Sequence, residues 1–250
     1  MGGAVNTNST LGSSNFDGSI QATVKANTTA GFSIVSYTGT GADGTIGHGL
    51  GVIPDAIILK NRDRTVEWIV KHHKLASGII GYLNLEDGFD GATGSNNGII
   101  NNLDNASTFG ISRYNNSGNY NNVGLNNEKV IAYCFSGVEG YSKFGIYTGN
   151  GSTNGPFVFL GFRPALVILR RSNGTGNWYL LDRKRNTFNY VDGRLKAETS
   201  GTEDTSYNVL SFLSNGFKVE NQYDGSWNGS GDSFIYFAFA ESPFKNSRAR

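Results

Sequence analysis

The chain has 250 residues, of which 35 are glycine, 38% are hydrophobic and 16% are charged, and its formal net charge is +1. Both the hydrophobic and the charged fractions are below those of ordinary globular domains, whereas Gly and Asn, which tolerate the positive φ of tight turns, are abundant. The near-neutral charge provides no general attraction to nucleic acid or to an anionic membrane.

The first segment, residues 1–30, is rich in Asn, Thr, Ser, Gly and Ala, with single apolar residues scattered through it. Such a segment cannot bury enough apolar surface by itself to offset the entropy lost on ordering. We therefore expect an extended N-terminal arm that becomes ordered only against another subunit or protein. A disordered leader is the alternative.

From residue 32 onward, short runs of β-branched and aromatic residues alternate with turns containing Gly, Asn and Asp. No window has sustained helical periodicity, and only residues 71–77 could form a helical turn. The pattern predicts strands at 32–37, 56–61, 67–72, 78–85, 109–114 and 129–135, then at 144–148, 165–171, 178–182, 206–212, 217–221 and 233–240.

The chain contains an internal duplication. Residues 37–41 (Tyr-Thr-Gly-Thr-Gly) return as residues 147–151 (Tyr-Thr-Gly-Asn-Gly), 110 positions later. The repeated residues are apolar, aromatic, Gly or Pro, which belong to cores and turns, and the polar residues between them mostly differ. The duplication therefore copied a scaffold and no active site. At the same spacing lie the pairs Leu50 and Leu160, Gly51 and Gly161, Pro54 and Pro164, Ile58 and Ile168, and Trp68 and Trp178.

Each half ends in its most apolar strand, residues 130–135 and 235–239. We expect these strands to be central in their sheets, because an exposed edge of this composition would invite aggregation. The sequence thus predicts an all-β fold with two tandem related halves, 31–140 and 141–250. These halves would form one antiparallel β-sandwich or two.

Residues that could hold a metal do not form an organised set. His72 and His73 are adjacent and would point to opposite faces of a strand, and His48 lies in a Gly-rich turn. The acidic loop 86–91 is oxygen-rich but lacks the spacing of an EF-hand. We therefore predict no metal site and no cofactor.

Catalytic motifs are equally absent from the sequence. Cys134 lies in an apolar run and is expected to be a buried small hydrophobe rather than a nucleophile. Acids such as Asp87, Asp90, Glu139 and Glu220 are not organised as a glycosidase pair. We predict no catalytic residues, with glycan hydrolysis as the alternative.

Each half has one aromatic and amide-rich loop, which precedes its last strand. Their Tyr and Trp rings could stack on sugars while Asn and Asp bind hydroxyl groups. We interpret them as glycan- or receptor-binding loops; long surface hairpins are the alternative. The candidate residues are Tyr114, Asn116, Tyr120, Tyr223, Asp224 and Trp227.

Most of the chain after residue 30 resembles the repeat modules of virion proteins from marine bacteriophages, including tail-fibre proteins of phages that infect cyanobacteria. The resemblance rests on residues 31–39, 48–51, 54–61, 138–145, 147–151, 161–165, 212–218 and 238–245. It implies a non-enzymatic virion structural protein, as a tail-fibre or host-attachment component. A carbohydrate-binding or depolymerising domain, a head decoration and a tail adaptor remain alternatives.

The same resemblance implies the partners. The N-terminal arm would dock to the particle or to a sister chain, in a homotrimer, and the body would contact a host surface glycan or protein. Neither nucleic-acid binding nor membrane insertion is expected. The N-terminus lacks the charged and apolar regions of a secretion signal, so we expect synthesis in the host cytoplasm and localisation to the virion.

Overall fold

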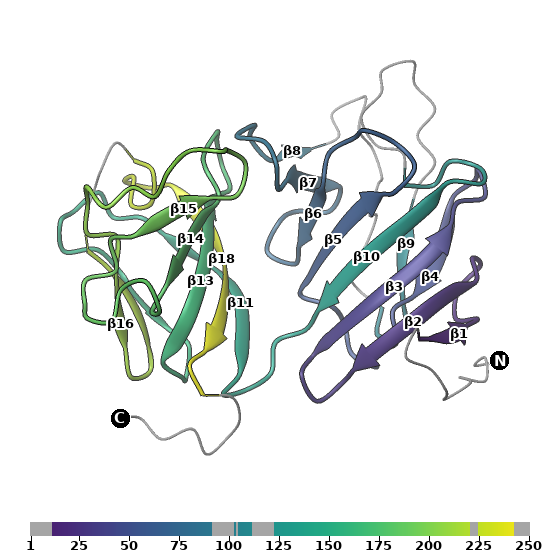
Figure 1. Cartoon of the computed structure of the whole chain (residues 1–250), viewed down its shortest axis with the longest axis horizontal. Helices are drawn as coiled ribbons and strands as arrows, with labels where there is room; N and C mark the ends of the chain where they lie inside the picture. Colours follow the sequence, from purple (N-terminus) through teal and green to yellow (C-terminus); the bar gives the residue numbers. More distant parts are fainter. Residues whose placement is uncertain (1–11, 92–102, 104, 112–122, 221–224, 243–250) are drawn as a thin grey trace. The chain divides into compact units, whose positions relative to one another are not determined.

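The computed structural model describes residues 12–91, 103, 105–111, 123–220 and 225–242. These residues form an all-β fold, as predicted (Figure 1). They contain no helix, and hence none that could cross a membrane. The chain divides into two compact units. The first contains residues up to Tyr82 together with Asp90–Ser136, and the second contains Leu83–Phe89 and the chain from Gly137 onward.

The first unit is built on one large antiparallel sheet and one small one. The small sheet pairs β4 (Gly44–Gly47) with β9 (Thr108–Ile111). The large sheet has the spatial order β1 (Ser13–Asn15), β2 (Ala22–Asn27), β3 (Phe32–Thr38), β10 (Lys129–Phe135), β5 (Ala56–Asn61), β6 (Ile69–His72), β7 (Ile79–Tyr82) and β8 (Asp90–Gly91).

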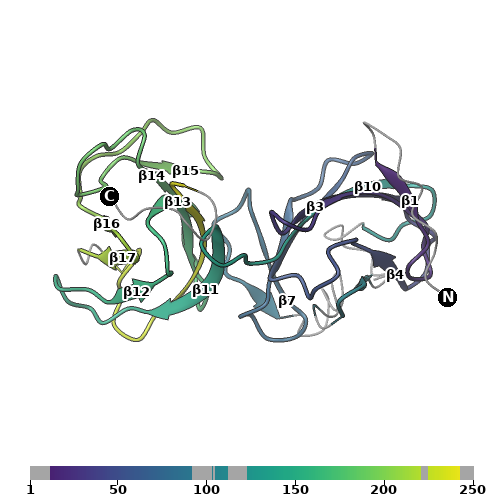
Figure 2. The ribbon, with the colours of Figure 1, turned by 90° about the horizontal axis from the view of Figure 1, so that it is seen from below.

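The second unit is a sandwich of a five-stranded and a three-stranded antiparallel sheet, and Figure 2 shows the small sheet facing the curved larger one. Alternate residues of both sheets point inward and enclose an apolar core that includes Leu169, Phe212, Phe217 and Phe234. The larger sheet has the order β11 (Ser142–Thr148), β18 (Ser233–Ala240), β13 (Pro164–Arg171), β14 (Tyr179–Asp182) and β15 (Arg194–Lys196); the smaller has β12 (Phe157–Phe159), β17 (Gly216–Val219) and β16 (Leu210–Leu213).

The two units repeat the same strand order, as two copies of one scaffold would. The order β3-β10-β5-β6-β7 of the first unit corresponds to β11-β18-β13-β14-β15 of the second. The most apolar strands, β10 and β18, are central as predicted, each between two antiparallel neighbours. Their registers also correspond, because Lys129 lies opposite Thr38 and Ser233 lies opposite Thr148.

The repeated Tyr-Thr-Gly-x-Gly motif has a structural cause. The buried hydroxyl of Tyr37 donates to the Val123 carbonyl oxygen at 2.8 Å, and that of Tyr147 donates to the Trp227 carbonyl oxygen at 2.7 Å. Two residues further on, a Cβ at Gly39 would lie 2.2 Å from a backbone oxygen, and Gly149 is confined in the same way. Each tyrosine thus fastens the segment that leads into the central strand.

The expected N-terminal arm is wrong for the part of it that the structure describes. β1 and β2 extend the first sheet, and β2 pairs with β3 over its whole length. Ile20, Ala22 and Val24 are buried in the core of the same unit. Alternation of small apolar and polar residues is enough here because a neighbouring strand supplies the rest of the core. Residues 1–11 lie outside the described residues.

The other boundaries are close to the predicted ones. Three strands, β5, β10 and β18, have the predicted bounds, whereas β4, β8, β12 and β15 were not predicted. The stretch 71–77 does not form a helical turn. Residues 71 and 72 belong to β6, and turns follow them. The buried Lys71 ammonium stabilises these turns by donating to the carbonyl oxygens of Ala76 and Ile79 at 2.7 and 2.9 Å.

Candidate functional site

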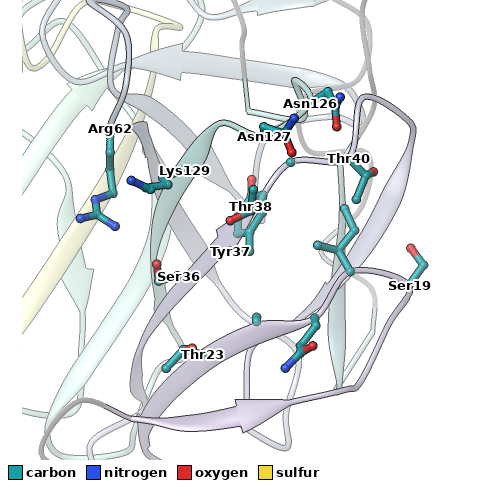
Figure 3. Close-up of a pocket in the computed structure, with 14 residues that line it drawn as sticks. Ser19, Thr23, Ser36, Tyr37, Thr38, Thr40, Arg62, Asn126, Asn127 and Lys129 are labelled. Atoms are coloured by element: carbon teal, nitrogen blue, oxygen red, sulfur yellow. The ribbon is translucent and has the colours of Figure 1, made fainter.

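An open polar groove of about 650 Å³ lies in the first unit, where the ends of four strands of the large sheet meet. Its walls come from segments that are far apart in the sequence: residues 19–23, 36–40, 62, 126, 127 and 129. Figure 3 shows Arg62 and Lys129 side by side at one end. Hydroxyl and amide side chains supply much of the remaining lining: Ser19, Gln21, Thr23, Ser36, Thr38, Thr40, Asn126 and Asn127.

The sheet register sets the lining side chains in rows. Thr23 of β2 lies opposite Ser36 of β3, and Thr38 of β3 lies opposite Lys129 of β10. The main-chain N–H of Arg62, which follows β5, donates to the Lys129 carbonyl oxygen at 2.8 Å. Because neighbouring strands are about 4.8 Å apart, the hydroxyl groups and the two cations form a continuous strip across four strands.

The side chains in this strip point away from the core. Ser36 and Thr38 flank the buried Tyr37, so strand alternation places them on the opposite face of the sheet. Thr23 is likewise exposed between the buried Ala22 and Val24. The core residues therefore fix the positions of the groove residues without using their polar groups.

The acids adjacent to the two cations of the groove in the chain are engaged by other groups. None of the described residues that line the groove is acidic. Glu128 is paired with Arg64, and Asp63 Oδ2 accepts the main-chain N–H of Lys129 at 2.7 Å. Neither Arg62 nor Lys129 forms an ion pair with another described residue. Both side chains are exposed and can meet a ligand.

The second unit has the same backbone at this place but different side chains. Ser172 and Ser233 occupy the positions of Arg62 and Lys129, and the Ser172 N–H donates to the Ser233 carbonyl oxygen at 2.7 Å. The Ser172 hydroxyl turns back to the same oxygen at 3.0 Å. Ile146 of β11 stands where the first unit has Ser36. Because β11 is the edge strand of its sheet, none of the described residues form a strand equivalent to β2. The cationic groove thus distinguishes the first unit from its copy.

The loop residues predicted to bind glycans divide into two groups. Tyr114, Asn116, Tyr120, Tyr223 and Asp224 lie outside the described residues.

Trp227 is the sixth predicted residue, and its expected surface position is wrong because the indole is only 1% exposed. The Arg194 guanidinium lies 5.1 Å from the Trp227 ring centre, and the ring also packs edge-on against Tyr179 at 5.7 Å. With its carbonyl oxygen held by Tyr147, Trp227 is a core residue in this structure.

The histidines considered as metal ligands have structural contacts. His48 is buried, with Nε2 at 3.2 Å from the Asn105 carbonyl oxygen, and Nδ1 accepts the Leu50 N–H at 3.2 Å. This arrangement requires the neutral ring, and burial lowers the pKa of His48. Across the described ranges, no three His, Cys, Asp or Glu side chains gather in a way that could hold a metal ion.

Cys134 is buried in β10, as predicted, and burial raises the pKa of its thiol to about 12. Among the acids considered for catalysis, Glu220 pairs with Lys218 at 2.9 Å, and the Asp87 main-chain oxygen accepts a hydrogen bond from Arg170. Burial of Arg170 lowers its pKa to about 10, and its guanidinium lies over Phe89 at 4.8 Å.

Sequence reasoning missed the groove and also a set of exposed aromatic residues in the second unit. Phe157 and Phe159 of β12 are 47% and 58% exposed, and the ammonium of Lys143 lies 5.4 Å above the Phe159 ring. Phe188 and Tyr190 are 84% and 50% exposed. The alternation Phe-Val-Phe at 157–159 was the available signal, since it predicts a strand with two rings on one face.

Comparison with known proteins gives one match. No curated protein and no solved structure matches the chain. A family model described as "Domain of unknown function (DUF7483)" matches residues 6–243 and so covers both units. The chain belongs to this family.

Proposed function

We propose that the chain is a non-enzymatic structural protein of a bacteriophage particle, a tail-fibre or host-attachment component whose first unit recognises a glycan on the host surface. It would act at the virion, in contact with other virion proteins and with sister subunits as a homotrimer. The likeness of its repeat modules to marine phage virion proteins supports the particle assignment.

The recognition role rests on one observation, the polar groove of the first unit. The second unit has the same backbone at this place but lacks the two cations of the groove. A duplicated framework with a different exterior on each copy is suited to presenting binding surfaces. Rows of hydroxyl, amide and cationic side chains on a rigid sheet can donate and accept hydrogen bonds with several sugar hydroxyls at once.

Particle labelling and adsorption competition test this proposal together. An antibody against the chain should label phage particles, and the purified chain should reduce adsorption of the same phage to its host. Labelling of the head would favour decoration, and labelling of the tail without competition would favour an adaptor. The absence of the chain from purified particles would contradict the virion assignment.

Oligomeric state and enzymatic activity are separate measurements. Sedimentation velocity should give the mass of a trimer. Incubation of the chain with host polysaccharide should release no new reducing ends, and their release would establish the depolymerase alternative instead.

A further inference from the structure

We infer that the groove of the first unit binds an acidic glycan, that is, a polysaccharide bearing carboxylate or sulfate groups. The inference deepens the proposed glycan recognition and rests on it. It names the chemical class of the ligand from the charge and the polar pattern of the groove.

The cationic end of the groove defines the charge of the ligand. Arg62 and Lys129 are held next to each other by the 2.8 Å main-chain hydrogen bond between them, and both side chains are exposed. A guanidinium group can bind a carboxylate or sulfate with two parallel hydrogen bonds, and an adjacent ammonium adds a third donor. Of the two acids adjacent to these cations in the chain, Asp63 has Oδ2 engaged by a main-chain N–H, and Glu128 is paired with Arg64.

The rest of the groove is suited to a polyol. From the cationic end the strip continues through Thr38 to the cross-strand pair of Ser36 and Thr23. These hydroxyl groups both donate and accept hydrogen bonds, as sugar hydroxyls do. An acidic sugar could therefore place its anionic group between the two cations and its ring over the hydroxyl strip.

A single-stranded nucleic acid fits the groove less well. Its bases would need aromatic side chains for stacking. Among the described residues of the lining only Tyr37 is aromatic, and it is 3% exposed with its hydroxyl engaged by Val123. Two cations are also few for a phosphate backbone, whose binding depends on many Lys and Arg contacts.

The second unit indicates which substitutions should remove the two cations without disturbing the backbone. Arg62→Ser with Lys129→Ser gives the first unit the side chains that Ser172 and Ser233 provide on the same backbone in the second. The double variant should therefore fold. A matched control replaces two exposed lysines outside the groove, Lys74→Ser with Lys184→Ser, and lowers the net charge equally.

Binding of the intact chain to four polymers tests the inference. Dextran sulfate and polygalacturonate are the acidic probes, and dextran and fully methyl-esterified polygalacturonate are their neutral counterparts with the same backbones. Isothermal titration should detect binding of at least one acidic polymer and weaker binding of its neutral form. Preference between the two acidic probes distinguishes sulfate from carboxylate.

The groove variant should lose about tenfold or more in affinity for the acidic polymer, since two charge-assisted contacts are removed. The control variant should stay within about twofold of the wild type, and wild-type affinity should fall as salt rises. Equal binding of neutral and acidic polymers, no binding of either acidic polymer, or full binding by the groove variant would overturn the inference.

The two proposals fail in different ways. If the chain competes for phage adsorption but the groove variant competes equally well, the acidic-glycan inference falls and the attachment function stands. If the chain binds acidic glycans through Arg62 and Lys129 but is absent from particles, the particle assignment falls and the ligand class stands.

Discussion

Replacing the repeated tyrosines by Phe should destabilise each unit separately. In the first unit, Tyr37→Phe keeps the ring, which packs edge-on against Phe109 at 6.4 Å, and removes only the hydroxyl. The Val123 carbonyl oxygen then loses its 2.8 Å donor at a residue with 0% exposure. Leaving a buried acceptor unpaired costs about 1–3 kcal/mol, so the unfolding equilibrium should shift by about fivefold or more.

The equivalent substitution in the second unit is Tyr147→Phe. Tyr147→Phe removes the 2.7 Å bond to the Trp227 carbonyl oxygen while the ring keeps its stacking on Phe234 at 5.0 Å. We expect a loss of similar size, since donor, acceptor and burial correspond in the two units. Tyr190→Phe serves as the control, because Tyr190 is 50% exposed.

Urea unfolding followed by tryptophan fluorescence measures both losses. Trp68 lies in the first unit, and Trp178 and Trp227 lie in the second. Tyr37→Phe should lower the midpoint of the transition reported by Trp68 when the other two tryptophans are replaced by Phe. A loss below about 0.5 kcal/mol, the usual range of surface substitutions, would refute the reasoning that these hydroxyls fasten the central strands.

Four further predictions follow from buried groups. Burial lowers the pKa of His48, so the unfolded chain binds more protons below pH 6.5 and stability should fall there; a flatter pH profile for His48→Gln would check this, and an unchanged one would contradict it. Burial lowers the pKa of Lys71 from 10.5 to about 8, so the unfolded chain binds more protons between these values and stability should increase as the pH rises from 8 to 10.5. The urea midpoint measured as a function of pH should show this increase, and Lys71→Met should abolish it. Arg170→Met removes a cation from between Phe89 and Trp178, with an expected cost of about 1–3 kcal/mol, and should speed hydrogen exchange in residues 83–89; unaltered exchange would argue against this role. Deleting residues 1–30 removes β1 and β2 and should unfold the first unit, whereas an unchanged Trp68 transition would count against the burial of Ile20 and Val24.

Strands that carry their own apolar pattern could be predicted from the sequence. β5, β10 and β18 are continuous or nearly continuous apolar runs, and their bounds agree with the prediction. β1 and β2 could not be recognised in this way, because Ala22 and Val24 are the only two buried apolar side chains of β2 and are small. Their burial depends on pairing with β3, a long-range contact that local composition does not report.

The groove was beyond sequence reasoning for a similar reason. Its cations, Arg62 and Lys129, are 67 positions apart in the chain and become neighbours only through the pairing of β5 with β10. A signal was nevertheless present in the duplication, since the equivalent residues of the second half are Ser172 and Ser233. The error over Trp227 arose because a loop rich in Gly and Asn was equated with exposure, while its indole fills the core.

The chain passes between the two units three times, since Leu83–Phe89 belongs to the second unit although its flanking residues belong to the first. A single proteolytic cut after Ser136 would therefore give two fragments and leave residues 83–89, which belong to the second unit, on the N-terminal fragment. Residues 137–250 expressed by themselves would also expose the Arg170 and Trp178 side chains that Phe89 contacts. Domain dissection of this protein consequently needs the heptapeptide grafted back, and simple truncation at the repeat boundary should give an aggregation-prone fragment.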